Sequence, residues 1–251
     1  FKRYTSVFLY YLISKQLFMA AVKLELSVPS SLDSIELWQY QKYMSVVEKN
    51  KDVENAEEFL NMKLVEIFCD ISLKDVSSIN LKDFDKISKI IATAFNEETP
   101  LVRHFELDGV EFGFIPNLDK VSIGEYIDAE AGVTGWKNMH KAMAVLFRPV
   151  TKKYKDKYQI EKYDAKQEYQ EVMKYMPLNV ALGALVFFYR LGKDLSNHTL
   201  NSLEKEMEEN KTIRQQVTSE LGGGGISRYT DLLEEKFSTL TGQLKFLHTK
   251  L

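Results

Sequence analysis

Alternating apolar and polar residues predict a β-hairpin near the middle of the chain. Residues 104–115 contain two such runs, and Asp108-Gly109 separates them. An Asp-Gly pair favours the type I′ hairpin turn, because both central residues of that turn need positive φ. Pro116 lacks an N–H donor and is expected to end the second strand. The residues that share the inward face of this strand are Val110, Phe112 and Phe114.

A similar alternation occurs near the start of the chain. Residues 23–28 place leucine and valine on one side and polar residues on the other, and Pro29 closes the run. This pattern predicts a half-buried strand. The order strand, proline, Leu-Asp, helix then occurs twice, over residues 23–40 and again over 110–126. The two segments are either two strands of one small sheet, each leading into a helix, or a coincidence.

Apolar residues spaced three and four apart predict several amphipathic helices. Ser122 and Glu125 have the spacing of a capping box, so a helix is expected to begin near Ile123. A further helix is expected over about 136–147, and Pro149 is expected to stop it. The other helices are expected over about 35–44, 54–69 and 81–95, the last opened by Asn80, and Ser72 has the spacing of another capping-box start.

The longest helix is expected to open at Pro177 and to be buried on all sides at first. Its apolar run ends near Leu191 and is too short to cross a bilayer. Gly183-Ala184 would allow another helix to approach closely. Residues 204–211 are almost wholly charged, which is typical of a segment that projects into solvent or is ordered by a partner.

The C-terminal part begins with a run of four glycines at 222–225, interpreted as a flexible hinge. No Gly-Lys-Ser/Thr follows the run, so it does not match a phosphate loop. Residues 226–251 are expected to form an amphipathic helix that docks in cis or onto another subunit. Its apolar stripe is Leu232, Leu233, Phe237, Leu240, Leu244 and Leu247.

These patterns divide the chain into four parts. Residues 1–22 form a separate N-terminal part. Residues 1–18 are interpreted as upstream translated sequence or a truncated edge, because Met19-Ala-Ala-Val-Lys has the form of a natural start. Residues 23–221 form a mainly helical α+β domain, 222–225 the hinge and 226–251 the terminal helix. The expected fold is a small antiparallel sheet with hairpins, packed against a helical body, followed by long C-terminal helices.

Composition narrows the class of protein. The chain has 251 residues, 45% of them apolar and 27% charged, with a net charge of −3. These values are typical of a globular domain and provide no overall field that would attract nucleic acid or an anionic membrane. Cys69 is the only cysteine, which excludes an internal disulfide. We expect Cys69 to be a buried, small apolar residue.

Lysine and tyrosine alternate after Val150. This pattern fits either a solvated hairpin that binds a protein partner or a groove that binds single-stranded nucleic acid. The partner-binding residues predicted from the sequence are Lys152, Lys153, Tyr154, Lys155, Lys157 and Tyr158 on this hairpin, with Leu233, Phe237, Leu240 and Leu244 on the terminal helix.

No catalytic motif is recognisable. The four histidines are dispersed without metal-ligand spacing, and the sequence has no Gly-x-Ser-x-Gly or dinucleotide fingerprint. We therefore expect a protein without catalytic residues, cofactor or metal. An enzyme whose site is built from residues far apart in the sequence remains an alternative.

Several stretches resemble a known group of proteins. FGFIPNLDKVSIGEYIDAE, WKNMHKAMAVLFRPV, YQIEKY and MKYMPLNVALGALVFFYRLGKDL resemble poorly characterised proteins of bacteriophage tail modules. KLVEIFCDISLKDVSSINLKDFDKI, ahead of the GVEFGFIP strand, is similar to tail and baseplate assembly chaperones of tailed phages. The resemblance covers about residues 23–195 and carries no catalytic or binding residue.

The resemblance implies a non-enzymatic protein that binds other phage proteins during tail or baseplate assembly, as a chaperone or a minor virion component. Its expected location is the host cytoplasm during assembly, with retention in the virion left open. The expected partners are other tail or baseplate proteins, with self-association as a further alternative and no membrane. A nucleic-acid-binding accessory protein that uses Lys152–Lys157 is the alternative function.

Overall fold

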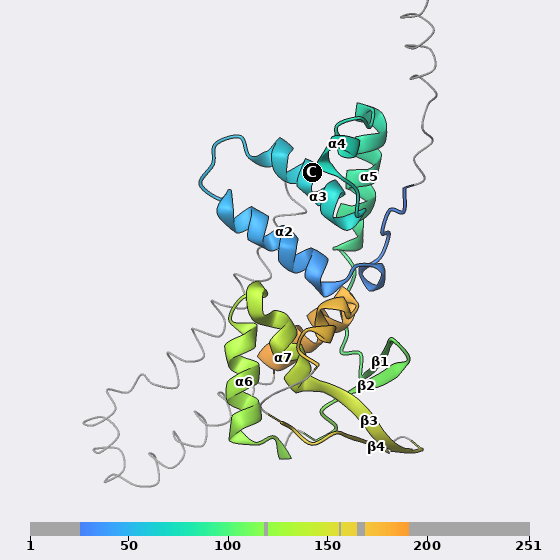
Figure 1. The fold of residues 1–251 in the computed structure, drawn as a ribbon, viewed down its shortest axis with the longest axis vertical. Helices are drawn as coiled ribbons and strands as arrows, with labels where there is room; N and C mark the ends of the chain where they lie inside the picture. Colours follow the sequence, from blue (N-terminus) through green and yellow to red (C-terminus); the bar gives the residue numbers. More distant parts are fainter. Residues whose placement is uncertain (1–25, 118–119, 156, 165–168, 191–251) are drawn as a thin grey trace, which may run out of the picture.

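The computed structural model describes residues 26–117, 120–155, 157–164 and 169–190 (Figure 1). It confirms the predicted class, because a small four-stranded antiparallel sheet packs against a mainly helical body. The segment 1–22, the glycine run 222–225 and the predicted terminal helix 226–251 lie outside the described residues, as does most of the region of the predicted long C-terminal helices.

The N-terminal half of the described chain is helical and follows the predicted pattern. Two of its helices begin at side-chain caps, where Ser72 accepts a hydrogen bond from Asp75 N and Asn80 accepts one from Asp83 N. The elements are the 3-10 helix η1 (Leu32–Ser34) and the α-helices α2 (Leu37–Lys49), α3 (Glu57–Phe68), α4 (Leu73–Val76) and α5 (Leu81–Ala94).

The sheet has strand order β1-β2-β3-β4, and every neighbouring pair is antiparallel. Asp108 and Gly109 form the β1–β2 turn with φ of 50° and 78°, which confirms the predicted hairpin. The strands are β1 (His104–Leu107), β2 (Val110–Phe114), β3 (Phe147–Tyr154) and β4 (Lys157–Ile160).

A helix over residues 178–190 lies between the N-terminal helices and the sheet (Figure 1, orange). Leu178 N donates to Ile35 O at 2.8 Å, and Phe187 packs edge-on against Phe114 with ring centroids 5.5 Å apart. It therefore joins both halves into one continuous core. The remaining elements are α6 (Ile123–Val133), η3 (Trp136–Asn138), α7 (Met139–Leu146) and η4 (Val172–Tyr175).

The strand predicted at 23–28 is not formed in its described part, since residues 26–30 have no regular secondary structure. Leu26 and Val28 nevertheless pack against the core while Ser27 is exposed. The alternation correctly marked the packed side of the segment, but no neighbouring strand pairs with it there. The predicted repeat of two sheet strands is therefore wrong.

Pro149 does not stop a helix, contrary to the prediction. Helix α7 ends at Leu146 and strand β3 begins at Phe147, so Pro149 lies within the strand. Strand β3 pairs with β2 over residues 147–149 and with β4 over residues 150–154. A proline is tolerated at this point because the hydrogen-bonding partner of the strand changes there.

Gly183 allows a close approach, although not by another helix as predicted. An added Cβ would lie 2.2 Å from Pro100 O, in the irregular segment before β1. The neighbour is therefore the backbone of an irregular segment.

Candidate functional site

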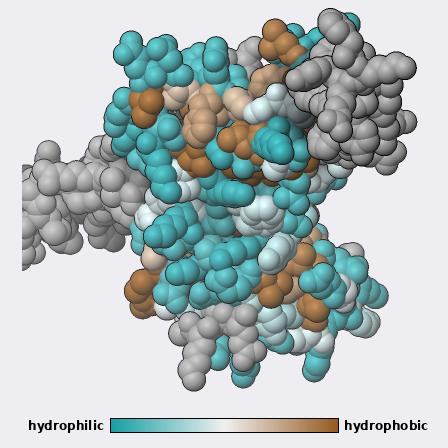
Figure 2. Space-filling view, turned by 45° about the horizontal axis from the view of Figure 1, so that its top comes forward, coloured by the Kyte–Doolittle hydropathy of each residue, from teal (hydrophilic) through white to brown (hydrophobic). Residues whose placement is uncertain are grey.

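Helix α6 presents large apolar side chains to solvent. Ile123 is 81% exposed, Ile127 56% and Tyr126 37%. Residues spaced by three and four lie on one side of a helix, so these three form one apolar surface, which we call the α6 face. Figure 2 shows a surface that is mostly hydrophilic and carries separate apolar patches. Amphipathic helices usually bury such a stripe, so an exposed one indicates a binding surface.

The α6 face is built on a firmly held helix. At its start, Ser122 Oγ accepts from Glu125 N at 3.2 Å, and Glu125 Oε2 accepts from Ser122 N at 2.7 Å. This is the capping box predicted from the sequence. The other oxygen of Glu125 accepts a hydrogen bond from Arg148 Nη2 at 2.7 Å, which ties α6 to β3.

The Glu125–Arg148 pair is buried, with side chains 9% and 10% exposed. Burial by itself would raise the pKa of Glu125, but the hydrogen bonds from Ser122 and the charge of Arg148 lower it below its ordinary value. Glu125 is therefore ionised at neutral pH. Breaking a buried pair of this kind leaves an uncompensated charge, so the contact fixes how α6 sits on the sheet.

The β3–β4 hairpin forms a projecting basic arm (Figure 1). This confirms the hairpin predicted after Val150. Tyr154 near its tip is 73% exposed, and Lys155 Nζ lies 5.7 Å from the centre of its ring. The other lysines predicted as partner-binding residues are also exposed on this arm, namely Lys152, Lys153 and Lys157.

Two residues of the predicted set are engaged within the protein. Tyr158 is half-buried and donates to Phe114 O at 2.6 Å, and its ring meets His104 edge-on at 4.2 Å. Burial raises the pKa of Tyr158. Lys153 Nζ donates to Glu111 Oε1 at 2.7 Å, so the negatively charged Glu111 carboxylate lies beside the arm and pairs with this lysine. The arm therefore presents one outward tyrosine, Tyr154, for stacking.

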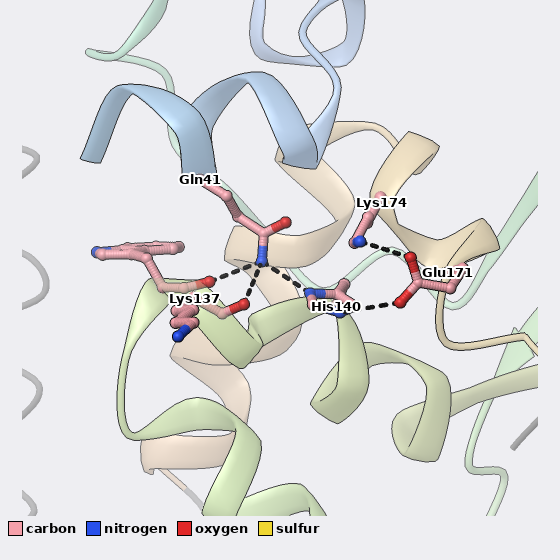
Figure 3. Close-up of polar contacts among 6 residues, drawn as sticks. Gln41, Lys137, His140, Glu171 and Lys174 are labelled. Carbon is pink, nitrogen blue, oxygen red and sulfur yellow. Dashed lines mark hydrogen bonds and ion pairs between the residues drawn. The ribbon is translucent and has the colours of Figure 1, made fainter. Parts of the chain in front are cut away.

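A polar cluster joins α2 to the C-terminal half of the described chain (Figure 3). Gln41 Nε2 donates to Trp136 O at 2.7 Å and lies 3.0 Å from His140 Nδ1. The other ring nitrogen of His140 is 3.8 Å from Glu171 Oε1, and Glu171 Oε2 accepts from Lys174 at 2.5 Å. We call these residues the α2–α7 joint.

The contact between Gln41 and His140 constrains the histidine. An amide nitrogen can only donate, so the contact is a hydrogen bond in the tautomer that has its lone pair on Nδ1 and its proton on Nε2. Burial lowers the pKa of His140, the charge of Lys174 lowers it further, Glu171 opposes this effect and Lys141 adds to it. A neutral histidine in this setting acts as a structural link between α2 and α7.

Among the residues that the structure describes, no group of three His, Cys, Asp or Glu side chains could hold a metal ion. In the same residues no helix is long and apolar enough to cross a bilayer. Cys69 is buried, as predicted, and burial raises the pKa of its thiol to about 11.

The candidate surfaces only partly match the residues predicted from the sequence. Leu233, Phe237, Leu240 and Leu244 lie outside the described residues. Ile123 and Ile127 were missed, although their spacing directly after the Ser122 cap was visible in the sequence. The same spacing also fits a buried stripe, so only the structure shows that this one faces outward.

Comparison of the chain with models of protein families, with curated proteins and with solved structures found no match.

Proposed function

We propose that this protein is a non-enzymatic bacteriophage protein that binds other phage proteins during tail or baseplate assembly. The α6 face is the observation that supports a binding role, because Ile123 and Ile127 expose large apolar area on a capped, anchored helix. Surfaces of this kind bind polypeptides by removing apolar area from water. The phage assignment rests on the resemblance of the sequence segments described above.

The arrangement of α6 suits such a role. A helix held by a capping box and a buried ion pair loses little conformational freedom when a partner binds, so more of the contact energy appears as affinity. The expected partner is a tail or baseplate subunit whose own apolar surface is exposed before assembly. Binding would then shield that surface in the host cytoplasm.

The test is co-expression of the full chain with the products of neighbouring tail genes, followed by affinity capture of the tagged chain. We expect one tail protein to co-purify with the wild type. Ile123→Asp with Ile127→Asp should reduce capture by about tenfold or more, because each substitution places a charge in a desolvated contact.

Leu81→Asp is the matched control, because Leu81 on α5 is 76% exposed and belongs to a different surface. Capture should be unchanged by this substitution. Absence of any co-purifying tail protein, or equal loss with both variants, would contradict the proposal.

The basic arm supports a second candidate function, binding of single-stranded nucleic acid through Lys152, Lys157 and the outward Tyr154. Lysines bind phosphates and release counterions, so affinity should fall steeply with salt. The test is fluorescence anisotropy with a labelled single-stranded oligonucleotide. Lys152→Glu with Lys157→Glu should abolish binding, whereas Lys82→Glu on α5 should not. Equal binding by both variants would exclude the arm as the site.

A further inference from the structure

Strand β1 directs one row of backbone hydrogen-bonding groups away from the rest of the sheet. In a two-residue hairpin the residues that flank the turn exchange both backbone bonds, and every second residue away from the turn does the same. Phe105 therefore bonds toward β2, and Phe114 N donates to Arg103 O at 2.8 Å as this alternation requires. The N–H and C=O groups of His104 and Glu106 consequently point outward.

These groups lie at an edge of the sheet. The strand order places β1 first, and in Figure 1 the β1–β2 hairpin lies at the right-hand side of the molecule. Within the described residues no strand pairs with the outer side of β1. Prolines, lysines and bulges often protect such an edge from pairing with another strand. Strand β1 contains none of them, whereas the opposite edge strand β4 begins with Lys157 and its ladder with β3 is bulged.

The hydrogen-bonding pattern of β1 matches a second copy of the same strand. In an antiparallel pair the backbone groups meet only where an outward-directed residue faces another one. Two-fold pairing centred on Phe105 meets this condition, because His104 of each copy then faces Glu106 of the other. Pairing centred on Glu106 would set two carboxylates directly opposite each other, which is unfavourable. Pairing centred on His104 would set Glu106 opposite Val102, in the irregular segment before β1.

The side chains favour the same register. Strand β1 has only four residues, so side-chain contacts must add to the backbone bonds. Glu106 is exposed and the side chain of His104 is 30% exposed, so an imidazole and a carboxylate would meet across the edge. Phe105 is half-buried and stacks on Phe112 with ring centroids 5.5 Å apart. The two copies of Phe105 would meet on this apolar side of the joined sheets.

We propose that two copies of this protein pair antiparallel through β1, with the two-fold axis at Phe105, and join their sheets into one. His104 and Glu106 of each copy exchange backbone hydrogen bonds with Glu106 and His104 of the other. The contact uses no residue of the α6 face. The inference therefore goes beyond the proposed function and is tested without a phage partner.

The first test is sedimentation velocity of the full chain over a series of concentrations, in which the wild type should form a dimer. Glu106→Pro removes an outward N–H group and leaves the bonds toward β2 in place, so it should raise the dimer dissociation constant at least about tenfold. Leu81→Pro is the matched control, because Leu81 is the exposed first residue of α5, where proline is tolerated. A wild type that stays monomeric, or equal dimerisation of Glu106→Pro and the wild type, would overturn the proposal.

A further variant separates this contact from the α6 face. Ile123→Asp with Ile127→Asp should dimerise as the wild type does, because neither residue lies on the edge strand. Loss of the dimer in this variant would assign self-association to α6 and overturn the proposal. Failure of the same variant to capture a tail protein concerns the proposed function alone.

The second test determines the register by disulfide cross-linking. His104→Cys and Glu106→Cys are prepared separately, mixed and oxidised mildly; Cys69 interferes little, because it is buried and its pKa is about 11. Facing residues are within disulfide range, whereas in either variant alone the two new cysteines lie diagonally, roughly 7–8 Å apart. The mixture should therefore give at least about fivefold more linked dimer than either variant alone. Equal linking by a single variant, or no link in the mixture, would contradict this register and the proposal.

Discussion

At the scale of single residues, the contact between α6 and α7 depends on the absence of one side chain. A Cβ added at Gly132 would lie 2.7 Å from both the backbone nitrogen and the Cβ of Ala142. These are backbone and near-backbone atoms that cannot rotate away. Gly132 therefore sets the distance between the two helices and, with it, the position of the α6 face.

We predict that Gly132→Ala lowers the free energy of unfolding by roughly 1–3 kcal/mol, because the helices must move apart to fit the methyl group. Urea unfolding followed by circular dichroism measures this loss. Gly135→Ala is the control, since nothing lies within 4 Å of its added Cβ and its φ of −170° is ordinary extended backbone. Equal stability of the two variants would show that the close contact is not required.

At the scale of elements, local sequence signals determine where several helices begin and where the chain reverses direction in the β1–β2 hairpin. Ser72, Asn80 and Ser122 each cap a helix through hydrogen bonds that span three residues. The β1–β2 turn likewise depends on Asp108 and Gly109 alone. Such signals act within one turn of backbone, which explains why the predicted helix starts and the hairpin are confirmed.

We predict that Gly109→Ala costs roughly 1 kcal/mol or more of folding stability, because φ is +78° and an L side chain is strained there. Thermal or urea unfolding measures the change. The matched variant is Gly124→Ala in α6, whose added Cβ would meet Tyr163 at an ordinary 3.6 Å. It should be neutral or stabilising by up to about 1 kcal/mol through helix propensity. A stabilising Gly109→Ala would contradict the assigned turn.

At the scale of the whole molecule, the α2–α7 joint and the helix over residues 178–190 hold the two halves of the described chain together. The helix contributes apolar packing, through contacts such as Phe187 on Phe114. The joint contributes a contact between Gln41 and His140 that depends on the protonation of the histidine. If Nδ1 of His140 gained a proton, that N–H would face the donor group of Gln41 and the contact would be lost.

We predict that acidification weakens the folded state through His140. Burial and the neighbouring Lys174 lower its folded pKa, whereas the unfolded chain binds a proton near the ordinary value of about 6.5. The unfolded state therefore takes up more protons as the pH falls through and below about 6.5, and the free energy of unfolding decreases. Urea unfolding at about pH 7.5 and about pH 5.5 should show this decrease in the wild type.

His140→Gln removes the titration and should show a smaller decrease between the two pH values. Glu125 and Glu171 have pKa values below their ordinary value, so both stay ionised between about pH 7.5 and about pH 5.5 and add little to the decrease in either protein. The difference between the two proteins therefore isolates His140. Parallel pH dependence in the wild type and the variant would show that the histidine does not contribute.

Sequence patterns whose structural outcome depends on distant parts of the chain predicted the fold less well than the helix caps and the hairpin turn did. The alternation at 23–28 correctly indicated that Leu26 and Val28 pack inward, but a strand also needs a neighbour to pair with. Pro149 carried a helix-stop signal and lies instead within β3, where the pairing partner changes. In both cases the outcome depends on segments distant in the sequence.

By itself the sequence determined the α+β class, the caps, the Asp108-Gly109 hairpin and the basic β3–β4 arm, because each depends on residues within a few positions of one another. Only the tertiary structure decided that Ile123 and Ile127 face solvent and that His140 is buried against Gln41. Exposure and protonation depend on what other parts of the chain pack nearby, and apolar spacing along a helix is the same whether its stripe is covered or open.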